Sequence, residues 1–294
     1  MKVNISTTIY HPRYKLKGAI LIIHGMSEHR KRYHAFARYL SDKGYGVITY
    51  DQIGHGESVN DESELGYFGK EKGYESLVYY AYKLSLETKN IFKDVPFYVF
   101  GHSMGSIIAR SLLKKHSEII DGVILSGPPF YQSAVKGGMA LAKLLSAIKG
   151  GKERSQILRN LTLGVYEKAV KSDVKNAWLS FNEENVKKYN EDELCGFNFT
   201  NKGYYDMLSG LVDMHDVKGY KVKDPMLPIL IIAGKEDPAI GKDKGLNITV
   251  NDLRRAGYDN IVVKLYENSR HEVLLDNEYK LVYDDVIEYL RKIV

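Results

Sequence analysis

Gly101-His102-Ser103-Met104-Gly105 stands between an apolar run at residues 96–100 and a stretch of helical period at residues 106–116. A Gly-x-Ser-x-Gly sequence on such a strand-to-helix turn is typical of a nucleophile elbow, which holds the serine hydroxyl clear of the sheet. The glycines suit this turn because a side chain at either position would collide with the neighbouring strand or helix. We therefore predict that Ser103 is a nucleophile and not an ordinary turn serine.

The chain around this turn alternates between buried strands and helices. Short runs rich in β-branched and aromatic residues recur at residues 19–23, 46–50, 96–100, 123–125, 229–233 and 261–266. Helical periodicity occupies residues 33–43, 74–88 and 107–116, and a terminal helix is expected over residues 272–294. This alternation predicts an α/β fold with a mostly parallel central sheet of buried strands. Ligands bind at the carboxyl ends of such strands.

The alternation stops between residues 127 and 228, where amphipathic helical segments replace the strands. We interpret this part as a helical cap at residues 128–226, inserted between two core parts at residues 1–127 and 227–294. One helical face of the cap carries Leu141, Leu144, Leu145 and Ile148, and glycine pairs at residues 137–138 and 150–151 bracket it. The stripe suits a helix packed on the domain, and the glycine pairs leave room for a hinged lid.

Aromatic residues gather in the rest of the predicted cap. They are Trp178, Phe181, Phe197, Phe199, Tyr204 and Tyr205. Two interpretations stay open, because these side chains suit either the lining of an acyl pocket or a small core of the cap itself. As candidate substrate-binding residues we take Gly25, Leu141, Leu145, Trp178 and Phe197.

A serine nucleophile needs a base within hydrogen-bond reach and an acid that orients the base. In folds with this elbow the partners follow in the order serine, acid, histidine, each after a later strand. Asp237 follows the run at residues 229–233 and His271 follows the run at residues 261–266, so we assign them as acid and base. Other acids remain candidates: Glu236, and Asp213 and Asp216 beside His215.

Two backbone N–H groups are expected to form the oxyanion hole. One belongs to Met104, directly after the nucleophile, and the other to Met26 in the loop after the strand at residues 19–23. His102 is interpreted as a packing residue. The turn at residues 51–56 is interpreted as scaffold.

No metal or cofactor is expected. The sequence lacks the lysine and glycine spacing of a phosphate-binding loop, and Leu275 stands four positions after His271 where a zinc-protease helix would need a second histidine.

Composition restricts the partners and the compartment. The net charge of +5 is spread along 294 residues without a basic block, which argues against nucleic acid as a partner. Cys195 is the single cysteine, and residues 1–10 lack the features of a signal peptide, so we expect a soluble, cytoplasmic protein. Lysines near the cap stripe suggest peripheral membrane contact through the cap, with a solvated helix face as the alternative. The oligomeric state is not indicated.

Several longer motifs resemble the monoacylglycerol lipase and lysophospholipase branch of the α/β-hydrolases. They are His24-Gly25-Met26-Ser27-Glu28-His29, Arg32-Tyr33, Gly54-His55-Gly56-Glu57-Ser58, the elbow, His271-Glu272 and the stretch at residues 194–200. The resemblance implies a serine hydrolase with a helical cap that acts on single-acyl lipid esters. It also implies Ser103, Asp237 and His271 as the triad, with Met26 and Met104 as oxyanion donors.

Three other functions stay open. A general short-chain carboxylesterase and an acyl thioesterase would use the same residues. A catalytically silent ligand-binding protein is possible on any such fold, because fold does not fix function.

Overall fold

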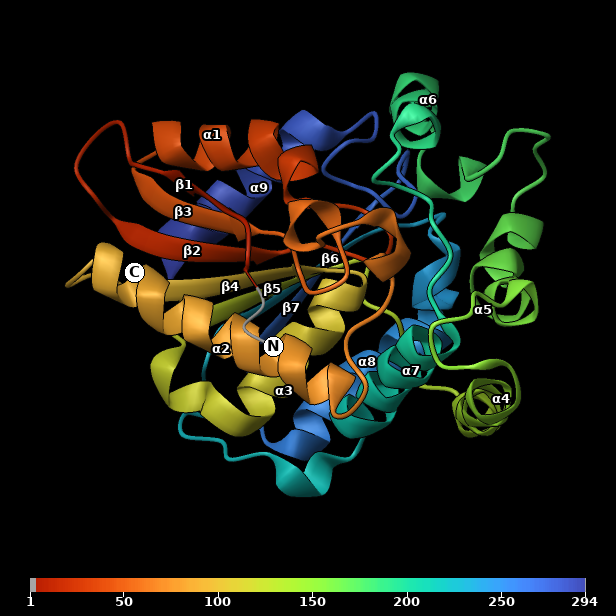
Figure 1. Cartoon of the computed structure of the whole chain (residues 1–294). Helices are drawn as coiled ribbons and strands as arrows, with labels where there is room; N and C mark the ends of the chain where they lie inside the picture. The colour runs from red at the N-terminus through yellow and green to blue at the C-terminus, as the bar shows by residue number, and fades with distance from the viewer. Residues whose placement is uncertain (1–3, 294) are drawn as a thin grey trace.

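The computed structural model describes residues 4–293. The first three residues of the N-terminal stretch and the last residue of the predicted terminal helix therefore lie outside the described residues. The described chain forms a seven-stranded sheet with the order β1-β3-β2-β4-β5-β6-β7. Helices cover both faces of this sheet, and a further group of helices lies at one end of it (Figure 1).

The strands confirm the predicted α/β class. In chain order they are β1 Thr7–Tyr10, β2 Gly18–Ile23, β3 Tyr45–Tyr50, β4 Phe97–His102, β5 Gly122–Ser126, β6 Ile229–Gly234 and β7 Ile261–Tyr266. β1 pairs antiparallel with β3, and the other pairings are parallel. β2 to β6 are buried at every position, which explains their continuous apolar sequences.

Each face of the sheet has its own apolar core. The helices are α1 His34–Asp42, α2 Gly73–Ile91, α3 Met104–His116, α4 Ala134–Lys149, α5 Gln156–Ala169, α6 Glu183–Glu191, α7 Asn201–His215, α8 Lys242–Ala256 and α9 Tyr279–Lys292. Short 3₁₀ turns are η1 Arg30–Tyr33, η2 Gly56–Ser58, η3 Glu62–Glu64, η4 Ser117–Ile119, η5 Ala177–Leu179, η6 Val217–Gly219 and η7 Pro238–Ile240. α1 and α9 cover one face, whereas α2, α3 and α8 cover the other (Figure 1). Successive side chains of β2 point to opposite faces of the sheet. Ile20 and Ile22 therefore pack in the core under α1 and α9, whereas Leu21 and Ile23 pack in the core under α2, α3 and α8.

α4 to α7 lie between β5 and β6, the part of the chain predicted as a cap. The first glycine pair does not bracket α4 as expected but lies inside it. A Cβ at Gly138 would lie 3.1 Å from Leu208 on α7, so this glycine allows the two helices to approach closely. Gly150, with φ +104°, ends α4.

Three elements differ from the sequence prediction. β1 was not predicted, because its four residues are half exposed and carry no apolar run. β7 was expected to be buried, but it lies at the sheet edge and only Tyr266 is fully enclosed. The terminal helix begins at Tyr279 and not at residue 272, because Glu272 and Asp276 bind other segments.

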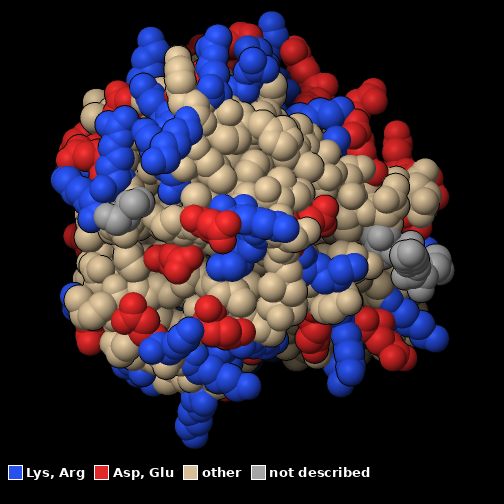
Figure 2. Space-filling view, turned by 90° about the vertical axis from the view of Figure 1, so that its left-hand side faces the viewer, with Lys and Arg blue, Asp and Glu red and all other residues tan. Residues whose placement is uncertain are grey.

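The surface mixes charges of both signs. On the face in Figure 2, lysine and arginine side chains lie among aspartate and glutamate side chains around a broad uncharged area in the upper half. Among residues 4–293, no helix combines the length and apolar content needed to cross a bilayer.

Candidate active site

Ser103 occupies the sharp turn between β4 and α3. Its backbone has φ +49° and ψ −116°, a strained conformation for a residue with a side chain. A Cβ at Gly101 would meet the backbone of Gly105, and a Cβ at Gly105 would meet the carbonyl oxygen of Ile23 on β2. Both glycines are therefore required by close backbone approach, as the sequence predicted.

Asp237 and His271 meet although they lie 34 positions apart. Asp237 follows β6, His271 follows β7, and Nδ1 of His271 lies 2.9 Å from Oδ2 of Asp237. Both side chains are buried. Nδ1–H donates to the carboxylate, which leaves Nε2 as the basic nitrogen. Glu236, the nearest rival for the acid, is exposed.

The remaining rival acids have other partners. Asp213 accepts hydrogen bonds from Ser111 and Lys114, and Asp216 lies 3.8 Å from Lys114. His215 pairs with Asp252 at 2.7 Å. None of these contacts leads to Ser103.

Burial and the carboxylate act in opposite directions on the pKa of His271. Burial lowers it, but the charge and hydrogen bond of Asp237 outweigh burial, so the pKa is raised from the usual 6.5. The imidazolium is therefore stabilised at the position where it would form during proton transfer.

Gly127 lies against this pair and was not singled out as a site residue. It has φ +51°, and a Cβ there would lie 3.0 Å from Nδ1 of His271 and 3.1 Å from Asp237. The sequence signal was the small residue directly after β5. Only a glycine combines this backbone angle with the space the acid and base require.

His102 packs against the base. Its ring centroid lies 4.7 Å from that of His271, and its Nδ1 lies 3.1 Å from the hydroxyl of Ser126. Burial, followed by the charge of His271, lowers the pKa of His102 to about 4. A neutral packing residue matches the interpretation from the sequence.

The loop after β2 lies directly beside Ser103. A Cβ at Gly25 would come within 3.2 Å of the Ser103 Cβ. The N–H of Gly25 donates to Oε1 of Glu28 at 2.5 Å. Met26 and Met104 both line the cavity above Ser103, and Met104 is the first residue of α3, where helical N–H groups have no acceptor within the helix.

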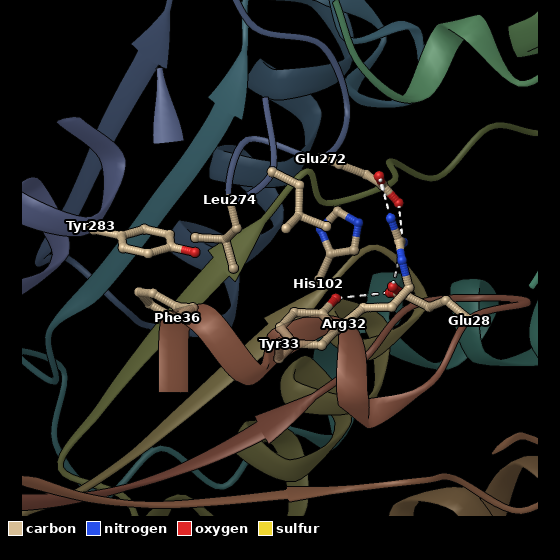
Figure 3. Close-up of a pocket in the computed structure, with 9 residues that line it drawn as sticks. Glu28, Arg32, Tyr33, Phe36, His102, Glu272, Leu274 and Tyr283 are labelled. Carbon is tan, nitrogen blue, oxygen red and sulfur yellow. Dashed lines mark hydrogen bonds and ion pairs between the residues drawn. The ribbon is translucent and has the colours of Figure 1, made fainter. Parts of the chain in front are cut away.

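A buried ion network connects the loop after β2 with the loop after β7, which carries His271 (Figure 3). Arg32 binds Glu28 at 2.9 Å and also pairs with Glu272, the residue after His271. Burial raises the pKa of Glu28, but Arg32 and other neighbours outweigh it, so the pKa falls to about 2. Asn185 of α6 donates to Glu272 at 2.7 Å. In the sequence Glu28, Arg32 and Glu272 are recognisable only as parts of motifs, because their contacts depend on the tertiary fold.

The turn at residues 51–56 holds the same loop from the other side. Gln52 donates its backbone N–H to Nε2 of His24 at 3.0 Å, and Asp51 accepts the N–H of Arg30 at 2.7 Å. Its predicted role as scaffold agrees with these contacts.

A cavity of about 350 Å³ opens above Ser103 and His271. Gly25 and Trp178 line it, and the Trp178 ring lies 4.9 Å from that of His271. Other lining residues are mostly apolar: Ile107, Leu158, Leu161, Val165, Met207, Leu208 and Leu211. Within residues 4–293 the lining does not include Leu141, Leu145 or Phe197.

The structure places these three candidate substrate-binding residues elsewhere. Leu141 and Leu145 of α4 pack against the core that includes α2, α3 and α8. Phe197 packs beside His55, with centroids 5.4 Å apart. The helical stripe could not indicate which side of α4 faces the cavity. The lining residues of α4 are Ala134, Val135 and Gly138, whereas Leu144 and Ile148 of the stripe are exposed.

One group of side chains has the composition of a metal site. Ligand atoms of His29, Asp192 and Cys195 lie within 4.8 Å of one another. His29 and Asp192 already share a hydrogen bond of 2.8 Å, and burial raises the pKa of the Cys195 thiol. That no metal is bound stays a prediction.

Comparison with known proteins agrees with this geometry. The family model described as serine aminopeptidase, S33, matches residues 14–278. The monoacylglycerol lipase of Mycolicibacterium smegmatis is 25% identical over 98% of this chain and 93% of its own length. The monoglyceride lipase of Saccharomyces cerevisiae is 26% identical over 95% of this chain and 86% of its own length.

Solved structures are similar over the whole length. A thermostable carboxyl esterase from Bacillus coagulans, in complex with glycerol, superposes with a TM-score of 0.89 at 26% identity and covers 100% of this chain and 96% of its own. The chain thus has the fold of these enzymes, including the helices between β5 and β6.

Proposed function

Because the chain belongs to the serine aminopeptidase S33 family of α/β-hydrolases, we propose that it hydrolyses monoacylglycerols through Ser103, His271 and Asp237. The observation that carries this proposal is the buried Asp237–His271 pair beside Ser103 under a mostly apolar cavity of about 350 Å³. A single acyl chain is the kind of ligand that such a lining favours. The curated relatives named as monoacylglycerol and monoglyceride lipases support the same substrate class.

The reaction proceeds through an acyl-enzyme. Nε2 of His271 takes the proton of the Ser103 hydroxyl as Oγ attacks the ester carbonyl. The N–H groups of Met26 and Met104 donate to the oxyanion that develops. His271 then protonates the departing glycerol, and water, deprotonated by the same nitrogen, releases the fatty acid. Asp237 stays ionised throughout.

In this proposal residues 128–226, with the helices between β5 and β6, form a cap over the active site. Leu158, Leu161, Thr162 and Val165 of α5 contribute to the cavity. Leu161 and Val165 are also more than half exposed, so they form its rim.

The cap rim is proposed as a surface for peripheral membrane contact. Ile157 on α5 and Leu144 and Ile148 on α4 are likewise more than half exposed. Exposed apolar side chains beside a substrate entrance suit insertion among lipid head groups.

The proposal is tested by hydrolysis of a medium-chain monoacylglycerol and a short-chain aryl ester by wild type and Ser103→Ala. We expect turnover of both esters by wild type, faster for the glycerolipid at equal concentration, and loss of essentially all turnover in Ser103→Ala. Circular dichroism establishes that the variant is folded. Residual turnover in a folded Ser103→Ala would show that another residue is the nucleophile.

Further substrates separate the alternatives. A lysophospholipid, an acyl-CoA and an amino-acid anilide are measured beside the two esters. Turnover restricted to the aryl ester would indicate a general carboxylesterase, and a preference for acyl-CoA a thioesterase. Preference for the anilide would assign the chain to peptide hydrolysis, as the family description suggests.

A further inference from the structure

Ser27 has an unusual position directly after Met26. It is completely buried and has φ +53°, a backbone angle that favours glycine. A serine at such a position is retained only where its surroundings hold it in place. Its contacts therefore indicate what the strained residue does.

Ser27 is held by three hydrogen bonds from one segment of the cap. Its hydroxyl donates to the carbonyl oxygen of Phe197 at 2.7 Å. Its own carbonyl oxygen accepts the Tyr189 hydroxyl at 3.0 Å and the N–H of Gly196 at 2.9 Å. These partners lie more than 160 positions away in the sequence. They hold the Ser27 hydroxyl and the peptide between Ser27 and Glu28. The peptide between Met26 and Ser27 is held as well, because the Ser27 N–H donates to Nε2 of His55 at 3.4 Å.

Two contacts keep the cap segment itself in place. Tyr189 is buried, and the Arg32 guanidinium lies 4.8 Å above its ring. Arg32 is the centre of the ion network in Figure 3, which also holds Glu28 against the Gly25 N–H. His29 adds a hydrogen bond of 2.8 Å to Asp192. Ser27 and His29 of the loop after β2 and Arg32 of η1 thus contact the cap.

We infer that Ser27 and Tyr189 are positioning residues that clamp the Met26 N–H in the oxyanion hole, so that the cap completes the hole as well as covering the substrate. The inference rests on the proposed function, in which Met26 is an oxyanion donor. It assigns to residues 189–197 a contribution to the chemical step. Loss of the clamp should therefore weaken binding of the transition state more than binding of the substrate.

The test compares two variants of Ser27. Ser27→Ala keeps the Cβ and removes the hydroxyl, whereas Ser27→Gly removes the hydroxyl and also relieves the backbone strain. A displacement of a catalytic group by about 1 Å costs up to about a hundredfold in rate, so we expect both to lower kcat by roughly ten- to a hundredfold with little change in KM. Tyr189→Phe should lower kcat in the same way, and its combination with Ser27→Ala should cost less than the product of the two.

Ser117→Ala is the matched control. Ser117 is also buried, and its hydroxyl donates to the carbonyl oxygen of Lys221 at 2.6 Å, across 104 positions and outside the site. This variant should keep the wild-type kcat. An arylboronic acid inhibitor, whose adduct with Ser103 places an oxygen in the hole, should bind less tightly to the Ser27 variants and equally well to Ser117→Ala.

The outcomes distinguish the inference from the proposed function. If wild type hydrolyses esters and both Ser27 variants keep its kcat and boronate affinity, the clamp is refuted and the triad is unaffected. A rise in KM at constant kcat would equally refute it, because the segment would then bind substrate. Equal labelling of wild type and Ser103→Ala by a fluorophosphonate would instead refute the proposed function.

Discussion

Ser27 and Ser103 are two residues with side chains that hold positive φ angles, +53° and +49°, around the proposed oxyanion hole. Such backbone costs about 1–3 kcal/mol and persists only where neighbouring contacts enforce it. At Ser103 the close approach of Gly105 to Ile23 enforces it, and at Ser27 the cap does. In the proposed mechanism Ser103 supplies the nucleophile, and Ser27 positions the N–H of the neighbouring Met26.

The raised pKa of His271 makes a prediction about pH. Nε2 acts as base only in neutral imidazole, so kcat/KM should rise with pH and level off above a pKa higher than the usual 6.5. Asp237→Asn removes the charge that raises this pKa while burial remains, so the acid limb should move to lower pH. The plateau should fall by about 10⁴, as for comparable triads.

Rates measured from pH 5 to 9 test this expectation. Glu236→Gln is the control, since this neighbouring acid is exposed and should leave the profile unchanged. An acid limb that stays in place in Asp237→Asn would show that Asp237 does not set the pKa of the base. The pH affects stability in the opposite direction from activity. Because the pKa of His271 is raised in the folded state, its protonation stabilises the fold below pH 6.5, and this contribution is lost as the pH rises through the folded-state pKa.

Among the elements, η1, α6 and the loop after β7 meet through Arg32. Its side chain is 9% exposed and its partners Glu28 and Glu272 are 4% and 5% exposed. Removing one partner of such a group leaves buried charges uncompensated. Arg32→Ala should therefore lower the free energy of unfolding by about 3–5 kcal/mol.

Urea unfolding of Arg32→Ala and Arg13→Ala measures this difference. Arg13 forms an exposed pair with Asp42 at 3.6 Å, and such pairs contribute about 0–1 kcal/mol. Equal losses in the two variants would mean that the buried network does not stabilise the fold.

The elements were predictable where one local pattern dominates. β2 to β6 are buried on both faces, so their apolar runs identified them within about two residues of their true ends. α9 was extended too far because Asp276 looks like a helical residue but accepts backbone N–H groups of Phe181 and Arg270. Long-range hydrogen bonds of this kind leave no periodic signal.

For the molecule as a whole, the proposed membrane contact combines the net charge of +5 with the apolar rim of the cap. We predict that the protein sediments with anionic vesicles, less so at high salt because ions screen the attraction. Ile148→Ser combined with Leu161→Ser should reduce the bound fraction.

Met226→Ser is the control for this measurement. Met226 is as exposed as Leu161, at 59% and 58%, but it precedes β6 and so lies at the end of the sheet away from Ser103. A bound fraction that falls equally in the control, or that does not depend on vesicles at all, would contradict contact through the cap.

The sequence by itself determined the α/β class, the elbow at Ser103 and the order of the candidate acid and base. It could do so because continuous apolar strands and a glycine-flanked turn are local features. Only the tertiary structure decided that Asp237 rather than Glu236 meets His271, that Leu141 and Leu145 face the core, and that Ser27 is bound by the cap. These outcomes depend on contacts between segments far apart in the chain, whose geometry is set when the sheet and the cap pack together.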